Sequence, residues 1–221
     1  MIPHRWDMTP TEAVALQREL AGLVVQTPIK HEVRTVAGID CAFADGGNRI
    51  LAAAVLCEAG TMEILARAEV DQPCRFPYVS GLLSFREAPA ILEAIAALPR
   101  RPDLVMCDGQ GIAHPRGLGL AAHVGLWLTC PTIGVAKSRL CGEHRTLGRR
   151  RGSRTQLKVG GEVVGAVVRT RDDVRPLYVS PGNRITIEES IRWVLRCGRG
   201  VRLPEPTRQA DRLVGRMKHR L

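Results

Sequence analysis

The chain has 221 residues, of which 45% are hydrophobic, 24% charged and only 4% aromatic, so it is long enough for a folded domain with a mainly aliphatic core. Lysine and arginine number 32 against 22 aspartates and glutamates, and the net charge of +10 favours polyanionic partners. These values argue against a disordered chain. The 7 cysteines, an odd number with no C-x-x-C pair, argue against a disulfide framework or a zinc ribbon.

The first half predicts a helix, a three-strand meander and a second helix. Thr9-Pro10-Thr11-Glu12 is typical of a helix start, and apolar residues at helical spacing follow as far as residue 25. Three apolar runs separated by short turns with glycine predict antiparallel strands at residues 35–43, 50–58 and 62–70. A helical period then begins at residue 84 and ends before Pro99.

The second half alternates strands with helices. We expect, in order, a buried strand at 104–107, a helix at 118–129, a buried strand at 132–136, a hairpin at 157–170 that turns at Gly160-Gly161, a strand at 177–180, and helices at 187–196 and 207–218. A meander followed by alternating strands and helices predicts an α/β fold with a mixed sheet flanked by helices. No repeat or change of composition marks a boundary, so residues 1–221 are expected to form a single domain.

Two aspartates stand where such a sheet would bind a ligand. Asp40 lies inside the predicted strand 35–43, and Asp108 follows the buried strand 104–107 and enters a glycine-rich loop. Ligands of open α/β sheets bind beyond the carboxyl ends of the strands. Each acid alone could equally cap a turn or pair with an arginine, but two carboxylates on neighbouring strands repel unless a cation lies between them. The pair therefore favours an oxygen-ligand site for Mg²⁺ or Mn²⁺, which suits phosphodiester hydrolysis.

Further residues could complete this site. Glu87, at the start of a predicted helix, is a candidate third carboxylate, although the helix dipole alone also favours an acid there. Lys137 follows an apolar strand and would emerge beside Asp108, where it could bind a phosphate or orient water, unless it is an ordinary surface lysine. His114 could serve as an acid, as a contact of the metal's outer shell or as a phosphate contact. His123, on an apolar helix, is expected to make a hydrogen bond in the core.

Two features of the sequence favour nucleic acid. Residues 137–158 hold eight lysines and arginines against the single acid Glu143, which fits contacts to a phosphate backbone, although such runs are usually only a solvated face. Pro77-Tyr78 lies between a strand and a helix, and an aromatic stiffened by proline can wedge between bases when a nucleotide is flipped out. An ordinary half-buried tyrosine is the alternative.

These residues form ordered blocks that resemble the endonuclease V family, the deoxyinosine 3′-endonucleases of DNA repair, which have a ribonuclease H-like fold. Each block is short, but their order and spacing are specific and cover residues from about 9 to about 210. The blocks are Val36-Ala-Gly-Ile-Asp40, Pro77-Tyr78-Val-Ser-Gly-Leu-Leu-Ser-Phe85-Arg-Glu87, Asp108-Gly-Gln-Gly111-Ile-Ala-His114-Pro-Arg116, Gly134-Val-Ala-Lys137-Ser and Tyr178-Val-Ser-Pro-Gly182.

The resemblance implies a role for each of these residues. Asp40 and Asp108 would coordinate Mg²⁺, for which Mn²⁺ can substitute, with Glu87 completing the acidic cluster and Lys137 assisting at the scissile phosphate. The residues expected to contact the DNA or the flipped hypoxanthine are the wedge Tyr78 with Pro77, and Gly81, Leu83, Gly111 and His114. Members of the family nick the second phosphodiester bond on the 3′ side of the deaminated base and leave 3′-hydroxyl and 5′-phosphate ends.

Two positions depart from the family pattern. Ser80 stands where the wedge motif usually ends in proline, which leaves the loop less stiff. Asn183 stands where the last block usually carries histidine; its carbonyl oxygen could still reach a metal or its water, but it cannot titrate near neutral pH. Activity is expected to survive, but to be weaker or to depend differently on pH.

The expected partner is double- or single-stranded DNA containing deoxyinosine. An inosine-specific endoribonuclease stays open, because nothing in these motifs shows how a 2′-hydroxyl would be received. A non-cleaving protein that binds deaminated bases also stays open, whereas Pro77-Tyr78 disfavours a general nuclease of this fold. Apolar runs such as residues 51–57 are far shorter than the roughly 20 residues of a membrane span. With no signal-peptide pattern at the N-terminus, a cytoplasmic protein is expected. A monomer is expected because no apolar stripe is left over once the core helices are assigned.

Overall fold

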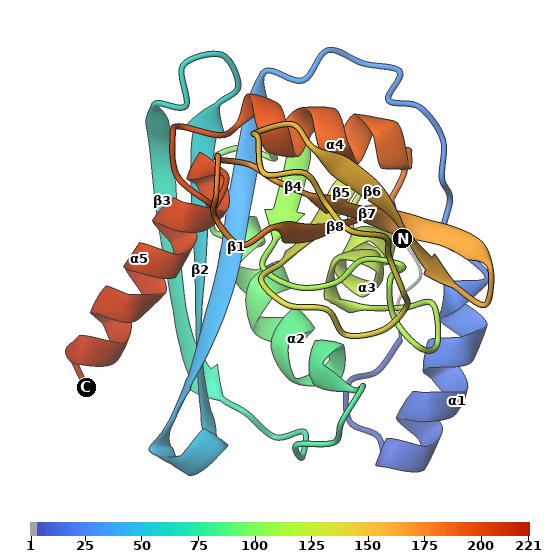
Figure 1. The fold of residues 1–221 in the computed structure, drawn as a ribbon. Helices are drawn as coiled ribbons and strands as arrows, with labels where there is room; N and C mark the ends of the chain where they lie inside the picture. The colour runs from blue at the N-terminus through green and yellow to red at the C-terminus, as the bar shows by residue number, and fades with distance from the viewer. Residues whose placement is uncertain (1–3) are drawn as a thin grey trace.

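The computed structural model describes residues 4–221, and its centre is one eight-stranded mixed sheet (Figure 1). The strands are β1 (Thr35–Ala44), β2 (Arg49–Glu58), β3 (Ile64–Pro73), β4 (Leu104–Cys107), β5 (Thr132–Ala136), β6 (Arg154–Val159), β7 (Glu162–Val168) and β8 (Leu177–Asn183). They lie in the order β3-β2-β1-β4-β5-β8-β7-β6. β4 is parallel to β1 and to β5, and the other neighbours are antiparallel. The expected meander followed by parallel strands is confirmed.

Helices cover both faces of this sheet. In the described chain they are α1 (Pro10–Ala21), α2 (Leu83–Ala96), α3 (Leu120–Trp127), α4 (Ile187–Arg196) and α5 (Glu205–His219), with a single 3-10 turn, η1 (Asp45–Gly47), between β1 and β2. α2 and α3 pack on one face, α4 and α5 pack on the other, and α1 lies against α3 (Figure 1). No helix of residues 4–221 combines the length and the apolar character needed to cross a membrane.

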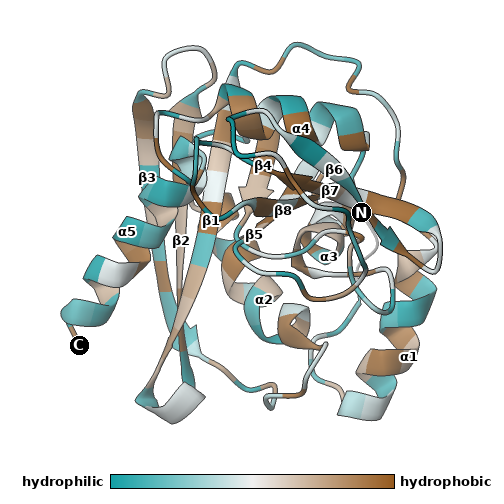
Figure 2. Cartoon of the chain, in the orientation of Figure 1, coloured by the Kyte–Doolittle hydropathy of each residue, from teal (hydrophilic) through white to brown (hydrophobic). Residues whose placement is uncertain are grey.

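The sheet separates two apolar cores, and strand alternation decides which side chain enters which core. In β2, Leu51 and Val55 face the core under α4 and α5, whereas Ile50 and Leu56 face the core under α2 and α3. The short strands β4 and β5 are buried along their whole length, as their apolar sequences predict. In Figure 2, hydrophobic colour gathers on the inner strands and on α3, whereas α1 and α5 carry mixed colours.

Several predicted elements have different ends in the structure: the strand expected over 62–70 is β3 (Ile64–Pro73), and the hairpin expected over 157–170 begins at Arg154 and ends at Val168. The helix expected over 9–25 stops at Ala21, because the following residues turn at Gly22, whose N–H bonds back to the carbonyls of Glu19 and Leu20. The helix expected over 118–129 is shorter and spans Leu120–Trp127. The strand expected at 177–180 continues as β8 to Asn183, since Pro181 lies beside an irregularity in its pairing with β5.

Candidate active site

Asp40 and Asp108 lie side by side at the end of the parallel ladder between β1 and β4. The ladder's last pair is Ile39 with Cys107, and the backbone N–H of Asp108 donates to the carbonyl oxygen of Ile39 at 3.1 Å. Each aspartate is therefore the first residue beyond the ladder between β1 and β4, although β1 itself continues to Ala44 in its pairing with β2. The structure brings the two predicted acids together at the carboxyl end of this parallel ladder, where α/β sheets place their ligands.

A third aspartate reaches this point from helix α5. The start of α5 packs directly on β1, because Gly38 has no side chain: a Cβ there would lie 2.0 Å from the carbonyl carbon of Pro206. This close approach brings Asp211 over β1, and one carboxylate oxygen from each of Asp40, Asp108 and Asp211 lies within 4.8 Å of the others. The sequence analysis did not identify Asp211. The available signal was that it is the only acid within the basic helix predicted over 207–218.

The donor set of these three carboxylates fits a hard divalent cation. All three ligands are oxygens, which Mg²⁺ and Mn²⁺ prefer. Opposite ligands of an octahedral Mg²⁺ are about 4.2 Å apart, twice its bond length, so separations of up to 4.8 Å need only a small closure. We therefore define Asp40, Asp108 and Asp211 as the aspartate cluster and regard it as the candidate metal site.

Lys137 provides the positive charge beside the aspartate cluster. It follows β5 directly, and its Nζ lies 2.5 Å from Oδ2 of Asp108 and 2.8 Å from Oδ1 of Asp211. Partial burial opposes ionisation, but the hydrogen bonds with both aspartates raise the pKa of Lys137. Burial raises the pKa of Asp108, and Lys137 opposes this rise. The structure thus brings Lys137 to the same sheet edge as Asp108, where its ammonium helps to keep that carboxylate ionised.

Glu87 approaches the cluster from α2, on the other face of the sheet, and is buried. Burial, followed by repulsion from Asp40 and Asp108, raises the pKa of Glu87 to about 8. Burial and the neighbouring Asp108 likewise raise the pKa of Asp40 to about 7. Without a cation, the site therefore holds protons at neutral pH, and a divalent ion would displace them.

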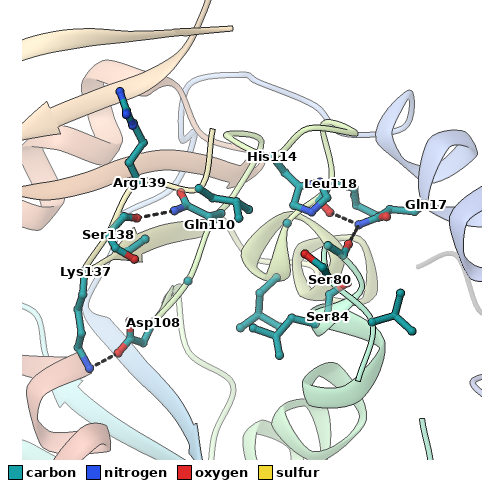
Figure 3. A pocket seen from close by; sticks show the side chains of 18 of the residues that line it. Gln17, Ser80, Ser84, Asp108, Gln110, His114, Leu118, Lys137, Ser138 and Arg139 are labelled. Carbon is teal, nitrogen blue, oxygen red and sulfur yellow. Dashed lines mark hydrogen bonds and ion pairs between the residues drawn. The ribbon is translucent and has the colours of Figure 1, made fainter. Parts of the chain in front are cut away.

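A cavity of about 430 Å³ opens beside the cluster; its lining includes Asp108 of the cluster and the neighbouring Lys137 (Figure 3). Its other walls come from the segment that leads into α2 and from the loop that follows Asp108. In the view of Figure 3, the Lys137–Asp108 ion pair lies at one end of the cavity, and Gln17 and Ser84 lie at the other. The volume is within the range of small-ligand pockets, roughly 300–1,000 Å³.

Gly81 is held in the cavity wall by a network of hydrogen bonds that sequence reasoning missed. Its φ of +79° is a conformation that favours glycine, and its carbonyl oxygen accepts from Nε2 of Gln17 at 3.0 Å and from Nη2 of Arg116 at 2.7 Å. Gln17 is almost completely buried and also donates to the carbonyl oxygen of Leu118 at 2.7 Å. The signal for Gln17 was a polar residue on the face of the first helix that also carries Ala13 and Leu20.

Only some of the other residues predicted to contact DNA line this cavity. Leu83 and Gly81 line the cavity, and Tyr78 lies at its wall with 75% of its surface exposed, whereas Pro77 lines a neighbouring cavity instead. Gly111 is buried behind the wall, because its backbone packs against β8: a Cβ would lie 1.9 Å from the carbonyl oxygen of Pro181. Gly111 is not among the residues that line this cavity and supports the loop from behind, so its contact with a base stays a prediction.

Two other polar residues differ from the expected chemistry. His114 lines the cavity, but burial, helped by Arg116, lowers its pKa to about 4, so it is neutral near pH 7 and does not present a charge to a phosphate. Asn183 is buried, with Oδ1 accepting from the N–H of Val25 at 2.9 Å and Nδ2 donating to the carbonyl oxygen of Gly125 at 2.8 Å. Its amide joins β8 to neighbouring backbone and is not one of the cluster's ligands, which corrects the expectation of a metal contact.

The comparisons with known proteins agree with this geometry. The family model of Endonuclease V matches residues 18–212. Endonuclease V of Azotobacter vinelandii is 54% identical over 211 residues, which cover 96% of each chain. The crystal structure of Endonuclease V from Streptomyces avermitilis is 40% identical, has a TM-score of 0.92 and covers 99% of this chain and 97% of its own.

A third relative is similar in fold. Ciona intestinalis Endonuclease V, crystallised with a 23mer DNA containing an inosine followed by a ribo-adenosine, is 22% identical, with a TM-score of 0.84, and covers 96% of this chain and 99% of its own. The expected ribonuclease H-like architecture is thereby confirmed. Because the family model and the closely similar relative both span nearly the whole sequence, this chain belongs to the endonuclease V family of nucleases.

Proposed function

We propose that this chain is a magnesium-dependent endonuclease of DNA repair that recognises deoxyinosine in double- or single-stranded DNA. It hydrolyses the second phosphodiester bond on the 3′ side of the lesion and leaves 3′-hydroxyl and 5′-phosphate ends. The observation that carries the proposal is that Asp108 belongs to both the aspartate cluster and the cavity, and that Lys137, which pairs with two of the cluster's aspartates, also lines the cavity. A base held in the cavity is joined to its own backbone, so a nearby phosphate is brought to the cluster. Residues 1–221 act as a single catalytic domain.

The cluster would hold the metal ion through Asp40, Asp108 and Asp211, and Mn²⁺ can replace Mg²⁺ in such an oxygen site. When bound, the ion lowers the pKa of a water and stabilises charge on the leaving oxygen. Lys137 keeps Asp108 ionised and can donate to a phosphate oxygen. Glu87, whose pKa is raised to about 8, can accept and return a proton near neutral pH.

Tyr78 is proposed to enter the base stack when the damaged nucleotide leaves it. An exposed aromatic at the cavity can replace the stacking that a flipped base gives up. Support for its ring comes from Arg86, whose guanidinium lies 5.9 Å from the Tyr78 ring centroid and 4.5 Å from that of Phe43. The net charge of +10 favours the polyanionic strand. The Ciona relative of the same fold was itself crystallised with inosine-containing DNA.

The test is a gel assay with end-labelled duplexes that contain one deoxyinosine or none. A magnesium-dependent nick one nucleotide beyond the lesion, absent in EDTA and with Asp108→Asn, is expected. Asp71→Asn is a matched control, because this aspartate lies on β3 and pairs with Arg49 at 2.6 Å. Binding without any nick would favour the non-cleaving alternative. Faster cleavage of a matched inosine-containing RNA would favour the endoribonuclease.

A further inference from the structure

Ser84 is a buried hydroxyl in the wall of the cavity. It lies in the first turn of α2, lines the cavity and is only 3% exposed. Within residues 4–221 its one side-chain hydrogen bond joins Oγ to Nδ1 of His123 on α3, at 2.9 Å. A serine hydroxyl has one hydrogen to donate and two lone pairs. Whether Ser84 offers its hydrogen or a lone pair to the cavity therefore depends on whether Nδ1 of His123 carries a proton.

The ring of His4 fixes the orientation of this hydrogen bond. Nδ1 of His4 lies 2.9 Å from the carbonyl oxygen of Arg5, which can only accept, so the proton of His4 is on Nδ1. Nε2 of His4 lies 3.3 Å from Nε1 of Trp127, which can only donate, so this nitrogen has no proton. The single lone pair of Nε2 of His4 faces two donors, and the nearer one is Nε2 of His123 at 2.8 Å, with Trp127 as the more distant second donor.

His123 therefore has its proton on Nε2. The ring is fully buried, and burial lowers its pKa to about 3, so the second nitrogen is unprotonated near pH 7. Nδ1 of His123 must accept, and the hydrogen it accepts is that of the Ser84 hydroxyl. With its hydrogen committed to His123, Ser84 can offer only lone pairs to a molecule in the cavity.

Donors lie next to this acceptor. Helix α2 begins at the cavity with Leu82 as its N-cap, and no side chain caps it. The N–H of Phe85 donates to the carbonyl oxygen of Leu82 at 3.0 Å, which leaves the N–H groups of Leu83 and Ser84 without a partner within the helix. A donor beside an acceptor matches the edge of a base that carries a carbonyl next to a ring N–H. Hypoxanthine, xanthine and uracil have this edge, whereas adenine and cytosine present the opposite pattern, an amino group next to a ring nitrogen with a lone pair.

We propose that Ser84 is a specificity-determining residue that accepts a hydrogen bond from the ring N–H of a deaminated base, and that His123 and His4 are positioning residues that keep its hydroxyl in this orientation. The inference rests on the proposed function. It also has a limit that can be measured: guanine shares the carbonyl and ring N–H edge, so Ser84 separates hypoxanthine from adenine but does not separate it from guanine.

The test measures binding of oligonucleotides with deoxyinosine, deoxyadenosine or deoxyguanosine at one position, by fluorescence anisotropy under conditions where no nick forms. Ser84→Ala is expected to lower the preference for deoxyinosine over deoxyadenosine by about 3- to 10-fold, the value of one neutral hydrogen bond, and to leave the preference over deoxyguanosine unchanged. His4→Phe is also expected to lower the preference for deoxyinosine over deoxyadenosine. Ser190→Ala is the matched control, since that buried helical serine donates to the carbonyl oxygen of Thr186 on α4.

Nitrogen-15 NMR of the histidine rings in the wild-type protein provides the second measurement and requires no substrate. We expect a neutral His123 protonated on Nε2 and a neutral His4 protonated on Nδ1. A proton on Nδ1 of His123 would overturn the inference. So would a Ser84→Ala protein that keeps the wild-type preference for deoxyinosine over deoxyadenosine. A wild-type protein without that preference would overturn the proposed function together with the inference.

Discussion

Replacing Gly38 by alanine tests how closely helix α5 must approach strand β1. A Cβ at this position would lie 2.0 Å from the carbonyl carbon of Pro206, whereas ordinary contact begins near 3.4 Å, so the helix has to move by about 1.4 Å. Overpacking of this kind costs about 1–3 kcal/mol of folding free energy. Gly38→Ala is therefore expected to fold, with a lower unfolding temperature.

The same displacement separates Asp211 from the other two aspartates. Metal ligands are held within about 0.2 Å of their ideal distances, so a shift of about 1.4 Å is enough to remove one ligand from the site. We expect Gly38→Ala to need a higher Mg²⁺ concentration for half-maximal nicking. Its rate on a deoxyinosine duplex should fall by a factor on the order of 100, as for other misplacements of about 1 Å.

Gly215→Ala is the matched control, because it lies in the same helix and nothing lies within 4 Å of a Cβ there. Alanine favours a helix over glycine by about 1 kcal/mol, so this variant should be at least as stable as the wild type and equally active. The measurements are Mg²⁺ titrations of nicking and thermal unfolding. A Gly38→Ala protein with wild-type metal dependence and unfolding temperature would refute the argument that β1 and α5 must touch for the cluster to form.

Four further predictions follow from the site. The pKa of Glu87 is about 8 in the folded protein against 4.5 for a free glutamate, so folding favours the protonated form. The resulting stabilisation is fully present below about pH 4.5 and is lost as the pH rises through 8. Glu87→Gln should therefore unfold at a higher temperature than the wild type in EDTA at pH 8.5, with no difference below pH 4.5. Lys137→Met removes the cation that lowers the pKa of Asp108. The rate of nicking should fall about 10- to 100-fold at pH 7, and the acid limb of its pH profile should move to higher pH. An acid limb that stays at the wild-type pH would contradict this role of Lys137. Tyr78→Ala removes a side chain that is 75% exposed, so the free energy of unfolding should change by less than about 0.5 kcal/mol. The value of kcat/KM should fall at least about 10-fold on duplex DNA and much less on single-stranded DNA. Equal losses on the two substrates would exclude a role of Tyr78 as a wedge. Asn183→His should lower the free energy of unfolding by about 1–3 kcal/mol, because the buried carbonyl oxygen of Gly125 loses its donor and the N–H of the more exposed Val25 loses its acceptor. The pH profile of nicking should stay unchanged.

Local sequence signals predicted the elements that have clear ends. Strands β4 and β5 match their predicted ranges because each apolar run ends at a charged residue, Asp108 or Lys137. Helix α4 matches because Thr186 and Glu189 form a capping box at its start. Strand β8 extends beyond its predicted end because Pro181, which would normally end a strand, lies where the pairing with β5 is irregular. That register depends on the partner strand and cannot be derived from a local pattern.

In the candidate active site, too, local sequence patterns predicted some residues, whereas others depend on contacts between distant segments. Asp108 and Lys137 were predictable together, because both follow apolar strands and such strands end at one edge of a parallel sheet. Asp211 was not, because its place depends on the contact between Gly38 and Pro206, which are far apart in the sequence. The orientation of the Ser84 hydroxyl was equally hidden, since it is set by side chains from three separate segments, the one that holds His4, helix α2 and helix α3.

The position of α5 in the chain has a consequence for the timing of activity during synthesis. This helix follows every strand of the sheet, and its residues Ala210, Leu213 and Val214 fill one of the two cores. A growing chain that has already made its sheet still lacks Asp211 and a cover for that face of β1. The metal site is therefore incomplete until α5 has been made and has docked on β1, because Asp211 comes later in the chain than Asp40 and Asp108.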